Sequence, residues 1–531
     1  MMKIASEYLI IIMIVNFIAT GCKQVNPDNP ELNLLTQSYY VSPDGDDLNP
    51  GTPNKPWKSI DKINSVDFKP GDSIMLKGGF TYSGTIHLSS SDSGTKNNKL
   101  FIGSYGTARA IILGENVEGI ILDHCTHLVV KNLTVVGAGR NEGNTKNGVI
   151  VKHSSFIELE NLEISGFQKS GLLLRNCSNT TIHQITAHEN GYAGITVDGQ
   201  QLLKTENRNI EILYCHAENN PGDPTNFTNH SGNGIIVGQC TKVKIAYCTA
   251  TNNGWDMPRT GNGPVGIWAW ESDSVIIENC LSYRNKTSVG GGDGGGFDLD
   301  GGVTNSVIQY CLSYENQGSG IGLFQYDMAT PWENNIIRFN ISINDGNVSG
   351  AKSGLSIWSA SPTNKLRKAL IYNNTIYNSD NAAIGFASIT FTEDFKFYNN
   401  ILVGKKEIIS GNTIRGAYLG NCWWSFNYGF NVNLITNFDQ WRVAKQQEML
   451  NGSPVGININ PDFIIPGSLD IKEAKELNEF LSFAVSNPAL FSKGININDL
   501  FDIDTGGKDF NEHPIPVHGI GASFNYLKNS E

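Results

Sequence analysis

Residues 148–197 read GVIVKHSSFIELENLEISGFQKSGLLLRNCSNTTIHQITAHENGYAGITV, and in them a short apolar segment recurs behind a glycine. These segments are GVIV at 148–151, GLLL at 171–174 and GITV at 194–197. Side chains alternate between the two faces of a strand, so the first and third residues after each glycine share a face. All of them are apolar here, and the stretch therefore predicts short strands that each bury one face.

The glycine-led segment continues along the chain as GIIV at 234–237, GIWA at 266–269, GFDL at 296–299, GIGL at 320–323 and GLSI at 354–357. The side chains expected to face a core are Val149 and Val151, Leu172 and Leu174, Ile195 and Val197, Ile235 and Val237, Ile267 and Ala269, Phe297 and Leu299, Ile321 and Leu323, and Leu355 and Ile357. A period of this length is typical of a solenoid, which grows by adding coils to one continuous core. The leucine-rich-repeat pattern and the hairpin signals of a propeller are both missing.

A second pattern supports the same fold. An Asn, Gln or Cys recurs at ten positions, spaced 23 to 34 residues apart: Asn132, Asn161, Gln184, Cys215, Cys248, Cys280, Cys311, Asn340, Asn374 and Asn400. We expect these side chains to stack in one internal ladder. The four cysteines, which we call the ladder cysteines, are then buried small side chains rather than members of a disulfide framework.

The N-terminus is typical of an exported protein. A positive charge at Lys3 precedes an apolar run from Tyr8 to Ala19, which ends at Ala19-Thr20-Gly21-Cys22. The run is short for a membrane span, so we predict a lipoprotein signal peptide with lipidation at Cys22, the alternative being an ordinary secretory signal. This predicts an exported protein with a lipid anchor in the outer membrane. The formal net charge of −12 argues against nucleic acid as a partner.

The ends of the mature chain carry a family resemblance. The segments Tyr40–Gly45, Gly51-Thr52, Pro56-Trp57, Lys69–Asp72 and Gly519–Ala522 resemble the opening and the ending of pectate-lyase-like β-helix proteins. With the repeat, the resemblance implies a right-handed parallel β-helix with an N-terminal cap. We expect a signal peptide at 1–21, a linker at 22–38, the β-helix at 39–420 and a C-terminal cap at 421–531. Within the cap, residues 439–449 and 471–483 are predicted to form short amphipathic helices.

The outward residues of the predicted strands describe a candidate glycan-binding face. They include Arg175, Asp198, Trp268, Trp270, Asp298, Asp300, Phe324 and Trp358, with Tyr326 just beyond. Aromatic rings stack on the apolar faces of sugar rings, so this row predicts a binding surface. The alternative is that a long turn or the C-terminal extension covers the tryptophans.

Long insertions before these strands, at 221–233, 254–265, 286–295 and 345–353, contain titratable residues. We expect them to deliver His230, Arg259, Lys286 and Asp293 to the rim of the same face, because long turns on a rigid scaffold commonly carry function.

The densest signal is GGGDGGGFDLDGG at 290–302. Asp298 and Asp300 are two apart on a strand, so both point to one face, and flexible glycines allow Asp293 to fold back toward them. Three such oxygen ligands suit a calcium ion that binds a uronate, and two carboxylates suit acid and base catalysis of glycoside hydrolysis. A purely structural role, capping backbone amides in a turn, is the remaining alternative.

Three functions follow. The first is β-elimination on an acidic polysaccharide or oligosaccharide of the pectin, alginate or ulvan type, by a lyase or by a dehydratase. In that reaction Arg175, Arg259 or calcium neutralises the uronate, Lys286 or His230 is the base, and Tyr326 or His230 is the acid. The resemblance implies that calcium with a basic residue is a common solution. The second is a glycoside hydrolase that pairs Asp298 with Asp300 or Asp198, and the third is a glycan-binding β-helix without catalysis.

Overall fold

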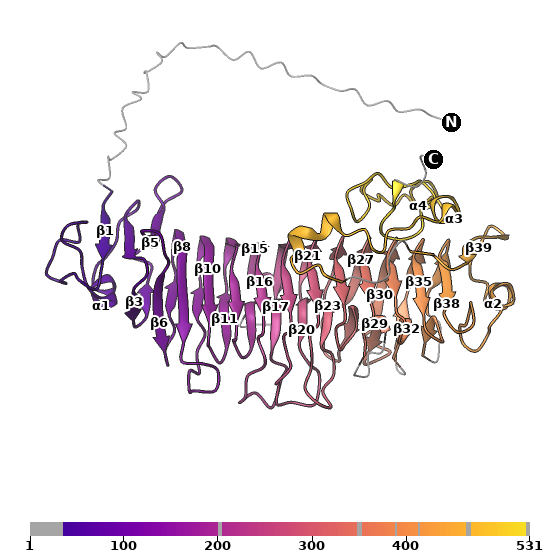
Figure 1. Ribbon diagram of the computed structural model, residues 1–531, viewed down its shortest axis with the longest axis horizontal. Helices are drawn as coiled ribbons and strands as arrows, with labels where there is room; N and C mark the ends of the chain where they lie inside the picture. The colour runs from indigo at the N-terminus through magenta and orange to yellow at the C-terminus, as the bar shows by residue number, and fades with distance from the viewer. Residues whose placement is uncertain are drawn as a thin grey trace, which may run out of the picture. The chain divides into compact units, whose positions relative to one another are not determined.

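The computed structural model describes residues 36–199, 204–347, 353–387, 390–411, 415–463 and 469–526. Its described strands form a parallel sheet of 27 strands and a second sheet of 12, wound as a right-handed parallel β-helix (Figure 1). The predicted fold class is therefore confirmed. The signal peptide and Cys22 lie outside the described residues. No described helix has the length and the apolar character that crossing a bilayer requires.

The glycine-led segments form the 12-stranded sheet. Its strands are β4 (Ile86–Leu88), β7 (Ile120–Asp123), β9 (Val149–Lys152), β11 (Ser170–Arg175), β14 (Ala193–Asp198), β17 (Asn233–Gly238), β20 (Val265–Trp270), β23 (Gly295–Leu299), β26 (Ile321–Gln325), β29 (Ser353–Ser359), β32 (Ala382–Phe386) and β36 (Ile409–Ser410). Every side chain predicted to face the core is at most 1 % exposed. The alternation read from the sequence is thus confirmed throughout this sheet.

The glycines are required by close packing between coils. A Cβ on Gly266 would lie 2.1 Å from the Ser282 hydroxyl, and one on Gly296 would lie 2.4 Å from the Ser313 hydroxyl. These serines belong to β22 (Leu281–Tyr283) and β25 (Leu312–Tyr314) of the larger sheet. The tight corner between the two sheets therefore admits no side chain at these positions.

The predicted internal ladder exists, but its first three positions are wrong. Cys215 donates its backbone N–H to the sulfur of Cys248 at 3.4 Å, and Cys311 donates its own to the amide oxygen of Asn340 at 3.0 Å. The ladder continues through Asn374, Asn400 and Asn421 to the buried carboxylate of Glu448. In the earlier coils the interior slot holds Leu133, Leu162 and Ile185, all fully buried.

Asn132, Asn161 and Gln184 instead occupy the preceding corner, where each has a positive φ of 51° to 57°. Asn161 donates to Asn132 along the outside of this corner at 2.7 Å. A slip of one residue moves a side chain to the opposite face, which is why these three residues point outward.

A second internal ladder was not predicted. Asn190, Asn220, Asn253, Asn285 and Asn316 each donate from the side-chain or backbone nitrogen to the amide oxygen of the next, over 2.9 to 3.3 Å. The series ends on the buried carboxylate of Asp345, which accepts from Asn316 at 2.9 Å. A stack of amides ends with one unpaired donor, and an acidic residue at the last rung satisfies it.

Both ends of the solenoid are covered. At the N-terminal end, β1 (Ser38–Val41) pairs with β2 (Ser73–Lys77), and α1 (Ile60–Asn64) packs beside β4. At the other end the solenoid extends beyond the predicted boundary at 420, because β38 (Cys422–Ser425) and β41 (Ile457–Asn458) continue the larger sheet.

The C-terminal segment, drawn in yellow in Figure 1, lies against the larger sheet. Its helical elements are a 3-10 helix η1 (Ala474–Glu479), α3 (Pro488–Ser492) and α4 (Ile497–Phe501), whereas α2 (Phe438–Lys445) precedes it. The two predicted helices are therefore present in shorter form. The Tyr314 hydroxyl donates to Ile471 O at 2.7 Å and Ala474 N donates to the Thr249 hydroxyl at 3.0 Å, which fixes the segment on this side.

Candidate active site

A cavity of about 1010 Å³ opens over the outer face of the 12-stranded sheet. Its floor comes from β20, β23, β26 and β29, and its walls come from residues of the loops at 229–230, 260–263 and 290–293. Figure 1 shows long loops projecting at one edge of β17, β20 and β23. The volume reaches the upper end of the range of about 300–1,000 Å³ that is typical of small-molecule sites.

Nine of the sequence-predicted site residues line this cavity. They are His230, Trp268, Trp270, Asp293, Asp298, Asp300, Phe324, Tyr326 and Trp358. Parallel register brings them together, since Trp268 pairs with Asp298, and Phe324 pairs with Trp358. We call residues 297–300, which begin in β23 and end just after it, the acidic strand. The alternation of its side chains places Asp298 and Asp300 in one site.

Glycines make the floor uneven. A Cβ on Gly238 would lie 2.2 Å from the Trp270 indole, so this ring lies across the preceding coil. A Cβ on Gly322 would lie 2.9 Å from a carboxylate oxygen of Asp298 and 2.8 Å from the Phe324 ring. The missing side chains thus leave room for the carboxylate and the aromatic rings that line the cavity.

The aromatic residues differ in access. Trp268 is only 4 % exposed. Its indole N–H donates to Asn233 at 3.1 Å, and His230 meets its ring edge-on with centroids 5.0 Å apart. Trp270, Phe324 and Trp358 are half-buried, and the last two rings meet edge-on at 6.5 Å. The expected open row of aromatics is therefore correct for these three rings, whereas Trp268 is covered.

Three carboxyl groups line the cavity, and burial raises the pKa of each. The pKa of Asp298 is raised well above its ordinary value by burial first and then by Asp300 and Asp293. One oxygen of Asp298 is buried without a hydrogen-bond partner. This residue is 3 % exposed, and its burial favours the neutral form of the carboxyl group.

The other two carboxyl groups reach the cavity and have lower pKa values. Burial raises the pKa of Asp300 to about 7, helped by the charges of Asp293 and Glu271 and opposed by the Gly301 N–H, which donates at 2.7 Å. Burial raises the pKa of Asp293 to about 6, opposed by the Gly263 N–H, which donates at 2.8 Å, and by the charge of Arg259. Near pH 6.5 the site thus contains both an acid and a carboxylate.

Glu271 lies behind this group and was not predicted. It is 2 % exposed and accepts hydrogen bonds from the Thr330 N–H at 2.8 Å and the Tyr326 hydroxyl at 3.4 Å. Glu271 follows Trp270 directly, at the end of β20. An acidic residue next to an outward-facing tryptophan was the signal in the sequence that could have identified it. Its charge raises the pKa of both Tyr326 and Asp300, after the larger effect of burial.

His230 lines the cavity as a neutral ring. Burial, together with the smaller effect of the nearby charge of Arg259, lowers its pKa to about 4. Its Nδ1 lies 3.1 Å from the side-chain nitrogen of Asn233. Arg259 itself does not line the cavity. Its guanidinium lies under Gly261, where a Cβ would be 2.8 Å from it.

Three predicted residues are placed elsewhere. Lys286 lines a separate hollow with Tyr283, Arg284 and Glu315, because it follows the ladder residue Asn285 before the chain turns toward the cavity. Arg175 and Asp198 form a two-pronged ion pair at 2.8 and 2.9 Å and do not line the cavity. The expectation that these side chains join the acidic strand is therefore not met.

Among the described residues, the carboxylate oxygens of Asp293, Asp298 and Asp300 do not all lie within 4.8 Å of one another. Calcium takes about six to eight oxygen ligands at about 2.3–2.6 Å. Among the described residues, the single group of three His, Cys, Asp or Glu ligand atoms within 4.8 Å of one another is Asp123, His124 and His153, far along the chain from β23. Calcium binding by this protein stays a prediction.

Comparison with known proteins links the chain to carbohydrate-active β-helix proteins. It is 26% identical over 334 residues to pectate lyase PEL9 of Emericella nidulans, covering 58% of this chain and 75% of that protein. It is 22% identical over 454 residues to the lacto-N-biosidase of Bifidobacterium longum subsp. longum, covering 64% of this chain. The match spans only 27% of the length of that lacto-N-biosidase.

Two solved structures also match the chain. The GH136 lacto-N-biosidase of Eubacterium ramulus matches with a TM-score of 0.49 and 19% identity, over 71% of this chain and 68% of that one. Pectate lyase Pel9A matches with a TM-score of 0.45 and 15% identity, over 92% of this chain and 97% of that one. The model of the Pel9A-like, right-handed β-helix region matches residues 39–349, more than half of the sequence. The chain therefore belongs to the family of Pel9A-like right-handed β-helix proteins.

Proposed function

We propose that this protein is a glycoside hydrolase that cleaves an oligosaccharide bound over β20, β23, β26 and β29. The observation that carries the proposal is the trio of carboxyl groups on the floor of an aromatic cavity. Asp293 and Asp300 have pKa values of about 6 and about 7, so one ionises before the other. Glycoside hydrolysis uses one protonated and one ionised carboxyl group in this way.

The proposed roles follow from access and charge. Asp300 donates its proton to the glycosidic oxygen, so that the leaving sugar departs as an alcohol. Asp293, whose negative charge is held by the Gly263 N–H, acts as the base for water or as the nucleophile. Burial raises the pKa of Asp298 well above its ordinary value, which disfavours a further negative charge at the floor. The rings of Trp270, Phe324 and Trp358 bind the sugar faces.

The charge of the cavity favours an uncharged sugar at the point of cleavage. Among the described residues that line it, none is Lys or Arg, whereas three are Asp. A uronate carboxylate placed beside these aspartates would meet like charges, which costs binding free energy. This departs from the acidic glycan expected from the sequence.

A second candidate, β-elimination on a uronate, is supported by the family match and by the likeness to a pectate lyase. In this case His230, neutral at pH 7, is the base and Tyr326 is the acid. The charge of Arg259, which acts on His230 and Asp293 from behind the wall, partly offsets that of the uronate. The weak basicity of His230 counts against it.

One experiment separates these candidates. The purified protein is incubated with neutral and uronate-containing oligosaccharides while new reducing ends and the ultraviolet absorbance of an unsaturated product are recorded. Reducing ends without absorbance support the hydrolase, and rising absorbance refutes it in favour of elimination. Asp300→Asn should abolish the signal, whereas Asp380→Asn, an exposed residue paired with Lys405 at 3.6 Å, should not. Binding without any reaction would favour the non-catalytic alternative.

We also propose that the chain is exported and anchored through a lipid on Cys22. The apolar run before Cys22 supports this proposal. Mass spectrometry of the membrane-associated protein should detect a lipidated N-terminal cysteine. A soluble, unmodified form after Cys22→Ser is the expected control, and an unmodified Cys22 in the natural chain would contradict the anchor.

A further inference from the structure

Two histidines and an aspartate converge at the surface of the N-terminal coils, away from the cavity. Asp123 ends β7 and lies in register with Lys152 at the end of β9. His124 and His153 follow directly, each with a positive φ, of 58° and 50°. Their rings stack with centroids 4.6 Å apart and an interplanar angle of 28°. The two imidazoles occupy equivalent positions on successive coils, and the stacking of the coils therefore places them side by side.

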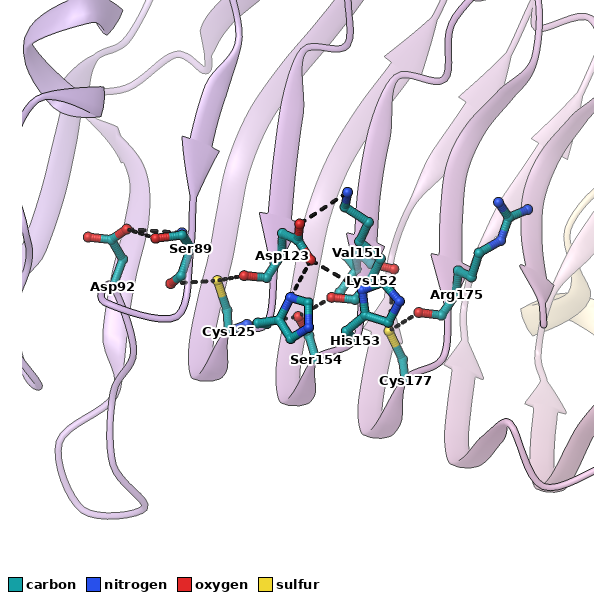
Figure 2. Close-up of polar contacts among 11 residues, drawn as sticks. Ser89, Asp92, Asp123, Cys125, Val151, Lys152, His153, Ser154, Arg175 and Cys177 are labelled. Carbon is teal, nitrogen blue, oxygen red and sulfur yellow. Dashed lines mark hydrogen bonds and ion pairs between the residues drawn. The ribbon is translucent and has the colours of Figure 1, made fainter. Parts of the chain in front are cut away.

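The backbone of this corner is fixed on both coils. His124 N donates to Lys152 O at 3.0 Å, and His153 N donates to Arg175 O at 3.0 Å. Below them, Cys125 N donates to the Ser154 hydroxyl, also at 3.0 Å (Figure 2). The two imidazoles and the carboxylate are therefore held in place by the repeat itself, which lowers the entropy lost when a ligand binds.

The separations suit one metal ion. The Nδ1 atoms of His124 and His153 lie 2.7 and 3.3 Å from the same oxygen of Asp123. An ion at about 2.0–2.2 Å from each ligand atom places neighbouring ligand atoms about 3.0–3.5 Å apart. The His153 separation lies in this range and the His124 separation is shorter than it, so a small outward shift of the His124 ring would let a metal ion replace the two hydrogen bonds.

Lys152 does not block this arrangement. Its ammonium contacts the other oxygen of Asp123 at 3.1 Å. Monodentate binding through the first oxygen leaves this ion pair intact, and it then orients the carboxylate from outside the metal site. The positive charge of Lys152 lowers the affinity for a cation without occupying a ligand position.

We propose that Asp123, His124 and His153 form a binding site for one divalent first-row transition-metal ion, which joins the coils of β7 and β9. Two imidazoles and one carboxylate favour zinc or copper over calcium or magnesium. The site leaves at least one coordination position for water. None of its three residues lines the active-site cavity, so the inference is independent of the proposed hydrolysis.

The test uses the full chain after removal of metals with a chelator. Zinc chloride is titrated in by calorimetry, and the melting temperature is followed over the same concentrations. We expect one equivalent to bind with a Kd of about 10 µM or tighter. The melting temperature should rise with zinc concentration, because the assembled site binds zinc more tightly than the same residues do in the unfolded chain.

Two variants decide the assignment. His153→Ala should weaken zinc binding at least tenfold and remove the rise in melting temperature. His127→Ala is the matched control, because His127 is also a corner histidine with positive φ and its ring also stacks, on Phe156. Zinc binding weaker than about 100 µM, or binding that His153→Ala leaves unchanged, would overturn the proposal. So would equal losses in the two variants.

Discussion

Replacing Asp300 with Asn should stabilise the protein at alkaline pH while it removes activity. Burial raises the pKa of this carboxyl group from its ordinary value of 3.8 to about 7. The folded state therefore favours the protonated form, and folding loses stability as pH rises above 3.8 until the group is fully ionised above about 7. Asn is neutral at every pH, and its side-chain oxygen still accepts the Gly301 N–H.

The magnitude follows from the shift of the pKa. One pKa unit corresponds to about 1.36 kcal/mol, so the full shift corresponds to about 4 kcal/mol. Asp300 is half-buried at the edge of an open cavity, and water reduces this value. We expect Asp300→Asn to gain about 2–4 kcal/mol near pH 8 and less than half of that near pH 5. Activity should fall at least about a hundredfold.

Denaturant unfolding at the two pH values measures the gain, and Asp273→Asn is the control. Although burial raises the pKa of Asp273, hydrogen bonds from Thr304 and Asn305, both at 2.7 Å, outweigh it and hold the pKa below its ordinary value. That variant should therefore lose stability near pH 8. A similar loss of stability in Asp300→Asn would refute the reasoning. It would mean that the ionised Asp300 carboxylate stabilises the turn at Gly301 and has a structural role instead of a catalytic one.

Three further predictions concern the core, the metal and the pH profile. The ladder cysteines should resist a thiol reagent until the protein unfolds, because all four are buried, and labelling of the native protein would contradict the ladder. Activity should persist in a chelator, since the acidic strand lacks three converging ligands; loss that added calcium restores would contradict this expectation. Glu271→Gln removes a negative charge that raises the pKa of Asp300, so the alkaline limb of kcat/KM should move to lower pH. An unchanged limb would exclude Asp300 as the acid.

The strands could be predicted from the sequence because their glycines mark the register. Each glycine occupies a corner too tight for a Cβ, so counting from it gives the facing of Phe297, Asp298 and Leu299 correctly. The asparagine ladder lacks such a marker. Asn132 and Asn161 lie one position before the interior slot, where the left-handed backbone also favours asparagine. An asparagine in the sequence therefore does not reveal whether it lies in the interior slot or at the corner before it. The register between neighbouring strands decides this.

The loops could not be predicted in the same way, because their positions depend on contacts between neighbouring coils. Asp293 reaches the cavity since Gly263 of the preceding loop donates to it, and no period in the sequence encodes that hydrogen bond. Lys286 fails to reach it because its backbone N–H is bound to Asn253 O at 2.8 Å, at the start of the loop and on another face. Two residues of the same predicted loop, Lys286 and Asp293, therefore line different hollows, and the position of a residue in a loop does not predict which site it joins.

The hollow in the floor of the cavity, in contrast, could be predicted from the outward-facing residues of the strands. Counting from the glycine places Asp298 and Gly322 in the same outward position of adjacent coils, and the register of β23 and β26 confirms the pairing. Gly322 has no side chain, so a hollow remains beside its larger neighbours. The Asp298 carboxylate and the Phe324 ring border this hollow. Gly322→Ala should therefore fill the floor next to Asp298, because its Cβ would lie within 3 Å of both groups. We expect this variant to lose substrate affinity more than stability, measured as a rise in KM with a small change in melting temperature. An unchanged KM would mean that the substrate does not reach the floor at Asp298.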